Sequence, residues 1–441
     1  MNKIYNLAFC GEVRRLQTDF FYRIISIFSI KYNMDSTERR NKIFLIGNGF
    51  DLSHGLPTRY VDFITWYLKD CCLKAIDGGV YSDDCLSVRI NKGYFYGLRK
   101  DLSEQIESFF EKNEIWGFVV KKQGITITTN TFGRSRDTNW SIKIEPKNEF
   151  CSNLLSNCLN ADWSGIEFEI NRIMLKEHSA LIESRTKIMI DRSTNQAYQS
   201  SLQRIKLLNS SIYHLKSKLI EYLSLNNNPE INKYELLLNE VNNEWGNIYK
   251  NSSFQTYENG KIREIPNPKV YRSVLFLNFN YTTYFEHQIV KEFESKFEDE
   301  YTDLETIFIH GDLGEPIDNI VFGVGDENKE TYSEIESLYD NDWLVPLKTF
   351  NYFRNEKYQQ LLGFIAKGDY DIYVIGHSCS TTDRTLLNML FENDACKKIN
   401  VYHYSGIDSY LATSYNIARN FNDKVRLRKV LQPFNPNLTT R

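Results

Sequence analysis

The sequence lacks the residue patterns that define metal centres and disulfide-stabilised secreted domains. Its eight cysteines are scattered without a repeated C-x-x-C, and neither an H-x-E nor an H-E-x-x-H motif occurs. Zinc sites use closely spaced ligand pairs of this kind, and disulfide frameworks belong mainly to short secreted chains. We therefore expect no bound metal and mostly reduced thiols, as in a cytoplasmic protein.

The chain also lacks a large excess of charge of either sign. Its 53 basic side chains stand against 57 acidic ones, which gives a formal net charge of −4. Non-specific nucleic-acid binding depends on a strong basic field, so the composition carries no strong nucleic-acid signal. A length of 441 residues allows one large domain with an insertion, or two domains.

The N-terminal segment is apolar but too short to cross a membrane. Residues 20–30 include Arg23, and they number 11, whereas a spanning helix needs roughly 20 apolar residues. We expect residues 1–40 to form a leader or an amphipathic segment that packs on the body. A secretory signal preceded by Arg14 and Arg15 is a second interpretation, and a translation start at Met34 is a third.

The most informative stretch is residues 43–59, IFLIGNGFDLSHGLPTR. Its four leading apolar residues predict a short buried strand that ends in Gly47-Asn48-Gly49. A buried strand followed by G-x-G presents bare backbone to a nucleotide phosphate in a doubly wound sheet, because glycine has no Cβ. The dehydrogenase fingerprint needs a third glycine where Leu52 stands, so we expect a different nucleotide-binding pattern.

Helical periodicity and β-branched runs predict a large insertion after this unit. Val61, Ile64 and Leu68 indicate a helix over residues 60–73. Strand-like segments follow at residues 119–120, 125–129 and 141–144. Further helices are predicted over residues 200–222 and 234–245. We therefore expect residues 81–265 to form a mixed, mainly helical insertion.

Strongly apolar strands return in the second half of the chain. They are predicted at residues 273–279, 306–309, 319–322, 371–375 and 398–404. Near-continuous apolar strands separated by helical segments indicate a parallel sheet covered on both faces. The predicted fold class is α/β, with a Rossmann-like domain formed by residues 41–80 and 266–441 and interrupted by the insertion.

Polar or glycine residues follow five of these strands at the point where each ends. The segments are Gly47-Asn48-Gly49-Phe50-Asp51, Asn280-Tyr281-Thr282-Thr283, His310-Gly311-Asp312, Gly323-Val324-Gly325-Asp326 and Gly376-His377-Ser378, with Asp383 shortly after the last. Active sites of open parallel sheets lie beyond the carboxyl ends of the strands. The segments therefore predict one site for a phosphate-bearing ligand.

This set of motifs resembles the AbiH family of bacterial abortive-infection proteins. The resemblance rests on IGNGFDLSHGLPT, on FNYT at residues 279–282 and on IGHS at residues 375–378. The sheet is also similar, more distantly, to the sirtuin NAD-binding fold. The glycines and proline of the sirtuin opening motif match Gly47, Gly49, Gly55 and Pro57. The sirtuin asparagine segment matches Asn280 and Tyr281, the sirtuin His-Gly pair matches His310 and Gly311, and the sirtuin Gly-x-Ser loop matches Gly376, His377 and Ser378. Thr282 departs from the sirtuin aspartate, Arg59 stands one position early, and no cysteine quartet for zinc is present.

The resemblance implies an antiphage effector that binds NAD as a substrate and hydrolyses its nicotinamide–ribose bond. Backbone N–H groups of residues 47–49 would hold the diphosphate. His310 would act as general base, while Asn280 would orient a ribose hydroxyl or water. Further expected contacts with the sugar, the histidine or the rest of the nucleotide come from Asp51, Asp312, Glu167 beside Trp163, Phe50, Gly376, His377, Ser378 and Asp383.

Other interpretations stay open for several of these residues. His310 and His377 compete for one catalytic role, and either fits a structural loop position. Asn280 also suits a turn, Asp383 a helix N-cap, and Glu167 an ion pair or the surface. His54 has no expected chemical role.

Alternative interpretations also stay open for the function and the partners of the protein. A non-catalytic nucleotide sensor and an RNA-directed toxin are the alternative functions, and a phage-derived trigger of unknown nature is expected. The apolar stripe over residues 200–222 indicates self-association as a homo-oligomer, gating of the site, or plain core packing.

Overall fold

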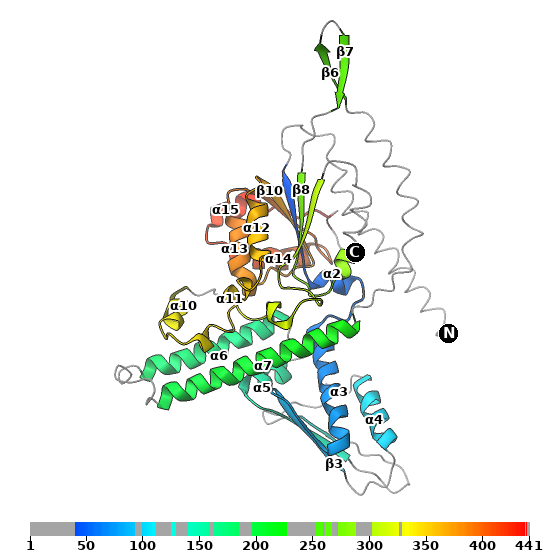
Figure 1. Ribbon diagram of the computed structural model, residues 1–441, viewed down its shortest axis with the longest axis vertical. Coiled ribbons are helices and arrows are strands. Elements are labelled where there is room, and N and C mark those ends of the chain that lie inside the picture. Colours follow the sequence, from blue (N-terminus) through cyan, green and yellow to red (C-terminus); the bar gives the residue numbers. More distant parts are fainter. Residues whose placement is uncertain are drawn as a thin grey trace, which may run out of the picture.

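A five-stranded parallel sheet forms the centre of the protein (Figure 1). The computed structural model describes residues 40–92, 99–111, 125–128, 140–157, 163–184, 196–226, 253–258, 261–266, 272–287, 302–325, 329–436 and 438. In spatial order the strands are β11 (Cys396–Val401), β10 (Tyr370–Ile375), β1 (Asn41–Ile46), β8 (Arg272–Asn278) and β9 (Thr302–Phe308). The predicted Rossmann-like α/β sheet is confirmed.

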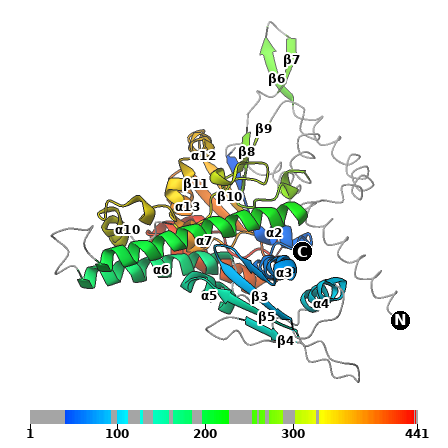
Figure 2. The ribbon, with the colours of Figure 1, turned by 60° about the horizontal axis from the view of Figure 1, so that its bottom comes forward.

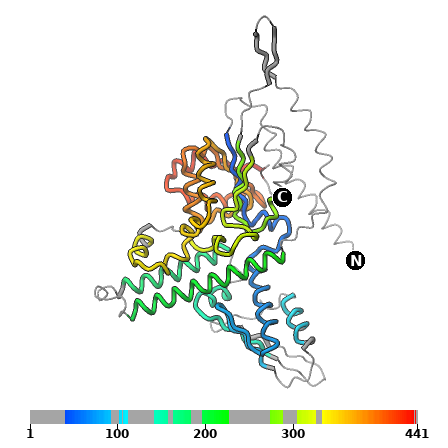
Figure 3. The backbone as a smooth tube through the Cα atoms, in the orientation of Figure 1, coloured from blue at the N-terminus to red at the C-terminus, as the bar shows by residue number. Residues whose placement is uncertain are grey.

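The strand order creates a ligand crevice beside β1. The chain continues from β1 to β8 and β9 on one side, then returns to β10 and β11 on the other. A doubly wound sheet opens a crevice at this reversal, outside the carboxyl ends of the strands. The ends are level, because Ile46 is in register with both Ile375 and Asn278. In Figure 3 the blue strand β1 lies beside the green strand β8, although the whole insertion separates them in sequence.

Alternating side chains of β1 attach the sheet to the layers on its two faces. Ile43 and Leu45 pack into the core shared with the helices on one face, labelled in Figure 1. These helices are α12 (Lys357–Ile365), α13 (Arg384–Glu392), α14 (Ile407–Asn420) and α15 (Lys424–Val430). Phe44 and Ile46 point the other way and pack with Phe50 of α2 (Asn48–Ser53). Residues 43–46 of β1, which pack on both faces, are accordingly all apolar.

The insertion adds a second sheet and two long helices. Its antiparallel sheet has the order β2 (Val80–Ser82), β3 (Leu86–Lys92), β5 (Trp140–Pro146) and β4 (Ile125–Thr128). Helix α3 (Tyr60–Gly78) leads into the insertion, whose own helices are α4 (Arg99–Glu111), α5 (Glu149–Asn157), α6 (Trp163–Ser184) and α7 (Gln196–Asn226). Helices α6 and α7 lie side by side below the carboxyl edge of the parallel sheet (Figures 1 and 2). The expected strands near residues 125–129 and 141–144 are confirmed.

Shorter elements complete the described chain. A separate two-stranded hairpin is formed by β6 (Ser253–Glu258) and β7 (Lys261–Pro266). The connection from β9 to β10 contains η6 (Ile317–Asn319), α10 (Lys329–Glu336), η7 (Asn341–Trp343), α11 (Lys348–Tyr352) and α12, and η8 (Thr381–Asp383) follows β10. The six cysteines of the described residues are buried, and none of them forms a disulfide bond. No described helix is both long and apolar enough to cross a membrane.

The strand predicted at residues 319–322 is wrong. The segment starts in η6 and continues as a loop, although Ile320, Val321 and Phe322 are all buried. The Val321 amide bonds the carbonyl of His310 at 2.8 Å instead of joining the sheet ladder. An apolar run reports burial on both sides, which a buried loop and a buried strand share.

The apolar stripe of α7 is core packing. Its members are buried in one cluster with α3 and α6, namely Leu202, Ile205, Leu208, Ile212, Leu215, Leu219 and Tyr222. The core-packing interpretation of the stripe is therefore confirmed, whereas self-association and gating by the insertion stay predictions. The predicted helix at residues 234–245, the strand at residues 119–120 and the leader at residues 1–39 lie outside the described residues.

Candidate functional site

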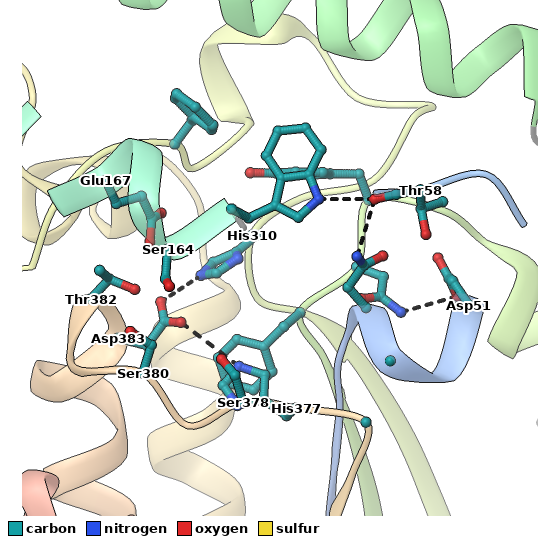
Figure 4. A pocket seen from close by; sticks show the side chains of 18 of the residues that line it. Asp51, Thr58, Ser164, Glu167, His310, His377, Ser378, Ser380, Thr382 and Asp383 are labelled. Atoms are coloured by element: carbon teal, nitrogen blue, oxygen red, sulfur yellow. Dashed lines mark hydrogen bonds and ion pairs between the residues drawn. The ribbon is translucent and has the colours of Figure 1, made fainter. Parts of the chain in front are cut away.

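A cavity of about 280 Å³ lies at the carboxyl edge of the parallel sheet (Figure 4). The segments after β1, β8, β9 and β10, including α2, line it together with the N-terminal end of α6, Leu223 of α7 and Lys348 of α11. Among the predicted site residues, the lining contains Asn48, Gly49, Asp51, Glu167, Asn280, Tyr281, His310, Gly376, His377, Ser378 and Asp383. The other predicted residues, Gly47, Phe50, Gly55, Pro57, Gly311 and Asp312, are outside the lining.

The glycines of the first and fourth loops pack the two backbones against each other. A Cβ at Gly47 would lie 2.5 Å from the Cα of His377, and one at Gly49 would lie 2.7 Å from the Gly376 carbonyl oxygen. The amides of Gly47 and Gly49 donate to the carbonyls of Ile375 and Gly376, at 3.0 and 2.8 Å. The amides of Gly47 and Gly49 are therefore already bonded within the protein, and diphosphate binding by this turn stays a prediction.

Replacement of Gly376 by alanine is expected to destabilise the fold by at least about 2 kcal/mol. Gly376 has φ +65°, and its Cβ would lie 2.2 Å from the amide nitrogen of Phe50. Urea unfolding of Gly376→Ala measures the effect. The matched control is Gly363→Ala in α12, where an added Cβ meets no atom within 4 Å and a gain of about 0.5–1 kcal/mol is expected. Equal stabilities of the two variants would contradict this role of Gly376.

The insertion anchors the loop at residues 55–58. Gly55 provides the positive φ of +80° that ends the turn after α2. The Tyr222 hydroxyl donates to the Pro57 carbonyl at 2.6 Å, and the indole N–H of Trp163 donates to the Thr58 carbonyl at 2.9 Å. Pro57 is therefore an anchor point for α7, outside the cavity lining.

Asp51 is a buried carboxyl group held by two neighbours from the second loop. The Thr282 hydroxyl donates to it at 2.5 Å and the Asn280 amide at 3.1 Å. Burial raises the pKa of Asp51 to about 7, although both hydrogen bonds act in the opposite direction. The difference between Thr282 and the aspartate of the sirtuin motif has a physical reason, because an aspartate at this position would place a second carboxylate against Asp51.

The Asn280 side chain lines the cavity, whereas the Asn278 side chain stabilises the turn that follows β8. The Asn280 side chain also donates to the Gly47 carbonyl at 3.2 Å. The Asn278 carboxamide oxygen instead accepts the backbone N–H of Asn280 at 2.9 Å. The side chain that bonds the backbone of this turn, a role considered above for Asn280, is therefore that of Asn278.

Lys348 connects the insertion to the parallel-sheet domain inside the cavity wall. Its ammonium, 3% exposed, lies 2.6 Å from Glu167 of α6 and 2.7 Å from Asp383 after β10. Burial opposes the charge, but Asp383 and Glu167 raise the pKa of Lys348. Burial raises the pKa of Glu167 to about 7, against the pull of Lys348. Glu167 is therefore an ion-paired residue of the site, away from the surface.

Asp383 stands between the lysine and the two histidines. It occupies the N-cap position of α13, but its carboxylate makes no capping bond and lies 3.3 Å from Nε2 of His310 and 3.7 Å from Nε2 of His377. Although burial opposes ionisation, Lys348 and the histidines hold the pKa of Asp383 well below its usual range. Asp383 is therefore an ionised carboxylate facing the histidines.

The ring nitrogens of His310 and His377 face protein groups. Nε2 of His310 lies 3.3 Å from the Tyr352 hydroxyl, and its backbone partner is Phe279. Nδ1 of His377 accepts the Cys379 amide at 3.0 Å, which places the proton of the neutral ring on Nε2. Burial lowers the pKa of His310, and it lowers that of His377 to about 4, so the His377 ring is neutral at pH 7.

Two further expectations about carboxylates and histidines are corrected. Asp312 accepts the amide of Gly314 at 2.8 Å within its own turn, where Gly311 adopts φ +90°. The carboxylate beside His310 is Asp383, whereas Asp51 bonds Asn280 and Thr282. Neither Asp51 nor Asp312 therefore orients a histidine.

Sequence reasoning missed Lys348, Thr58 and Ser164, which also line the cavity. Lys348 is the first residue of the short helix α11 and belongs to no recognisable motif, so only the fold places it in the site. Thr58 directly follows Pro57 in the opening motif, which is a signal that could have identified it. In the described part of the chain, no group of three metal-ligating side chains converges.

The chain belongs to the AbiH family, described as bacteriophage abortive infection AbiH, which it matches over residues 43–404. This span contains every residue that lines the cavity. No curated protein and no solved structure matches the chain. Family membership indicates a role in bacteriophage abortive infection.

Proposed function

We propose that this AbiH protein binds NAD in the cavity and hydrolyses its nicotinamide–ribose bond. The observation that carries the proposal is a pair of buried carboxyl groups in one cavity, each with a pKa of about 7. Glu167 comes from α6 and Asp51 from α2, and Figure 4 shows them on opposite sides of the cavity. Perturbed carboxyl groups in a cleft are typical of catalytic sites.

Cleavage of this bond needs stabilisation of a cationic sugar and a base for water. The bond to nicotinamide breaks through an oxocarbenium-like state, as in other glycosidic cleavages. Asp51 and Asn280 are suited to hold a ribose hydroxyl and place negative charge near the sugar. Glu167 is suited to take the proton of the attacking water, since its pKa lies near neutral pH. Nicotinamide leaves as a neutral molecule, so its departure needs no acid.

The geometry moves the proposed base from His310 to Glu167. The nitrogens of His310 and His377 are directed at Tyr352, Asp383 and the backbone. A carboxylate oxygen keeps a further lone pair after one hydrogen bond, so Glu167 can bond water while paired with Lys348. Asp383 is then a positioning residue that holds Lys348, and the two histidines face Asp383.

Purified full-length protein should convert NAD to equal amounts of nicotinamide and ADP-ribose. Chromatography of the products measures this conversion, alone and after addition of lysate from phage-infected cells. Asp51→Asn keeps the shape of the side chain and is expected to abolish most of the release. No nicotinamide under either condition, or full activity in Asp51→Asn, would overturn the proposal.

The internal bonding of the histidines also favours a second candidate, a nucleotide sensor without turnover. A site whose polar groups are already paired binds ligand without supplying free acid–base groups. Calorimetry that shows NAD binding with no products would select this function.

A further inference from the structure

The cavity combines an excess of acidic side chains with a single cationic side chain that could neutralise a phosphate. Its described lining contains three carboxyl groups, from Asp51, Glu167 and Asp383, against a single ammonium and no arginine. That ammonium, on Lys348, is within 2.7 Å of two of the carboxyl groups and is almost wholly buried. The Gly47 and Gly49 amides are likewise bonded to carbonyls. A diphosphate would therefore meet carboxylates here, with no free cation or amide from these residues.

The size of the cavity indicates one nucleoside rather than a dinucleotide. Pockets for drug-sized ligands have volumes of about 300–1,000 Å³, and this cavity measures about 280 Å³. Aromatic rings of Trp163, Phe279, Tyr281 and Phe322 contribute to its lining. Aromatic faces attract cations as well as flat rings. A flat, positively charged ring is thus suited to both the charge and the walls.

One unsatisfied hydroxyl adds a partner for a sugar. Thr58 is buried, and its Oγ1 has no hydrogen-bond partner although it lines the cavity. Thr58 and Asp51 lie on the same side of the cavity in Figure 4. A buried hydroxyl without a partner is costly, and a ribose hydroxyl between Thr58 and Asp51 would satisfy it.

We infer that the cavity recognises an N-ribosyl pyridinium, the cationic half of NAD, and leaves the phosphates outside. The inference rests on the proposed function and names the part of the substrate that is selected. The positive charge of the oxidised ring is the feature recognised, together with the ribose hydroxyls. Nicotinamide riboside, which has no phosphate, is accordingly a sufficient ligand.

Calorimetry on the full-length protein compares NAD, nicotinamide riboside, NADH and ADP-ribose. Nicotinamide riboside should bind within about tenfold of NAD, whereas NADH, whose ring is uncharged, should bind at least about tenfold more weakly. Asp51→Asn should weaken nicotinamide riboside about tenfold and NADH clearly less, because both carry the ribose hydroxyls but only nicotinamide riboside carries a cationic ring. Glu169→Gln, on the same helix as Glu167 but paired with Arg172 outside the cavity, is the control and should change neither affinity.

The outcomes separate this inference from hydrolysis. Equal affinity for NAD, NADH and ADP-ribose, with none for nicotinamide riboside, would overturn the inference even if NAD is hydrolysed. Binding of nicotinamide riboside without release of nicotinamide would support the inference and remove the hydrolase function.

Discussion

Replacement of Lys348 by methionine is expected to lower the free energy of unfolding by about 3–5 kcal/mol, the usual cost of removing one partner from a buried ion pair. The Lys348 ammonium lies between Glu167 and Asp383, so its loss leaves two buried carboxyl groups facing each other. Methionine keeps most of the side-chain volume, which limits any cavity effect. Urea unfolding monitored by circular dichroism measures the change.

A surface lysine gives the matched control for Lys348. Lys176 pairs with Glu149 at 2.6 Å, but its side chain is 53% exposed, and exposed pairs contribute about 1 kcal/mol or less. Lys176→Met should therefore leave stability almost unchanged. Adding Glu167→Gln to Lys348→Met should recover part of the loss, since one buried charge is removed. Similar stabilities for the two lysine variants would contradict the buried pair.

Replacement of Glu167 by glutamine is expected to reduce the rate of NAD hydrolysis by about 10²–10⁴, the contribution typical of a general base. Glutamine retains the hydrogen-bonding shape but cannot accept the proton of water. The kcat should therefore fall with little change in KM. The Glu169→Gln variant of the same helix should retain the wild-type rate, because Glu169 pairs with Arg172 outside the cavity.

The pH profile provides an independent check on Glu167. With a pKa of about 7, the ionised fraction of Glu167 rises about tenfold between pH 6 and pH 8. Wild-type activity should rise at least as steeply over this range, because Asp51 also loses its proton there. Glu167→Gln should show a flatter profile. An unchanged profile with an unchanged kcat would assign the base to another group.

The parallel sheet could be predicted because buried strands have a continuous apolar pattern. The ends of β1, β8, β9 and β10 also place their polar residues at one edge, which is why Asn280, His310 and His377 were expected to meet. The run at residues 319–322 shows the limit of this reasoning. Its apolar residues are as buried as those of a strand, but they belong to a loop.

The partners within the site depend on directions that sequence spacing does not carry. Asp383 lines the cavity at the edge that the sequence predicts. Its pairing with Lys348 depends on the start of helix α11, which lies 35 residues earlier in the chain. The role of Thr282 depends on the fold, which brings its hydroxyl within hydrogen-bond distance of Asp51. The Gly47 and Gly49 turn has the nucleotide-binding sequence pattern, yet its close approach is to another loop of the same protein.

The hydrogen bonds from Tyr222 and Trp163 to residues 57–58 join the insertion to the parallel-sheet domain at the cavity, so both parts of the chain form its walls. One wall belongs to the parallel sheet, and the opposite wall, with Glu167, belongs to helices that fold as part of the insertion. A change in how the insertion docks would separate Glu167 from Asp51 without altering a strand. In the proposed hydrolase, the docking of the insertion thus sets the separation of the two carboxyl groups on which the activity would depend.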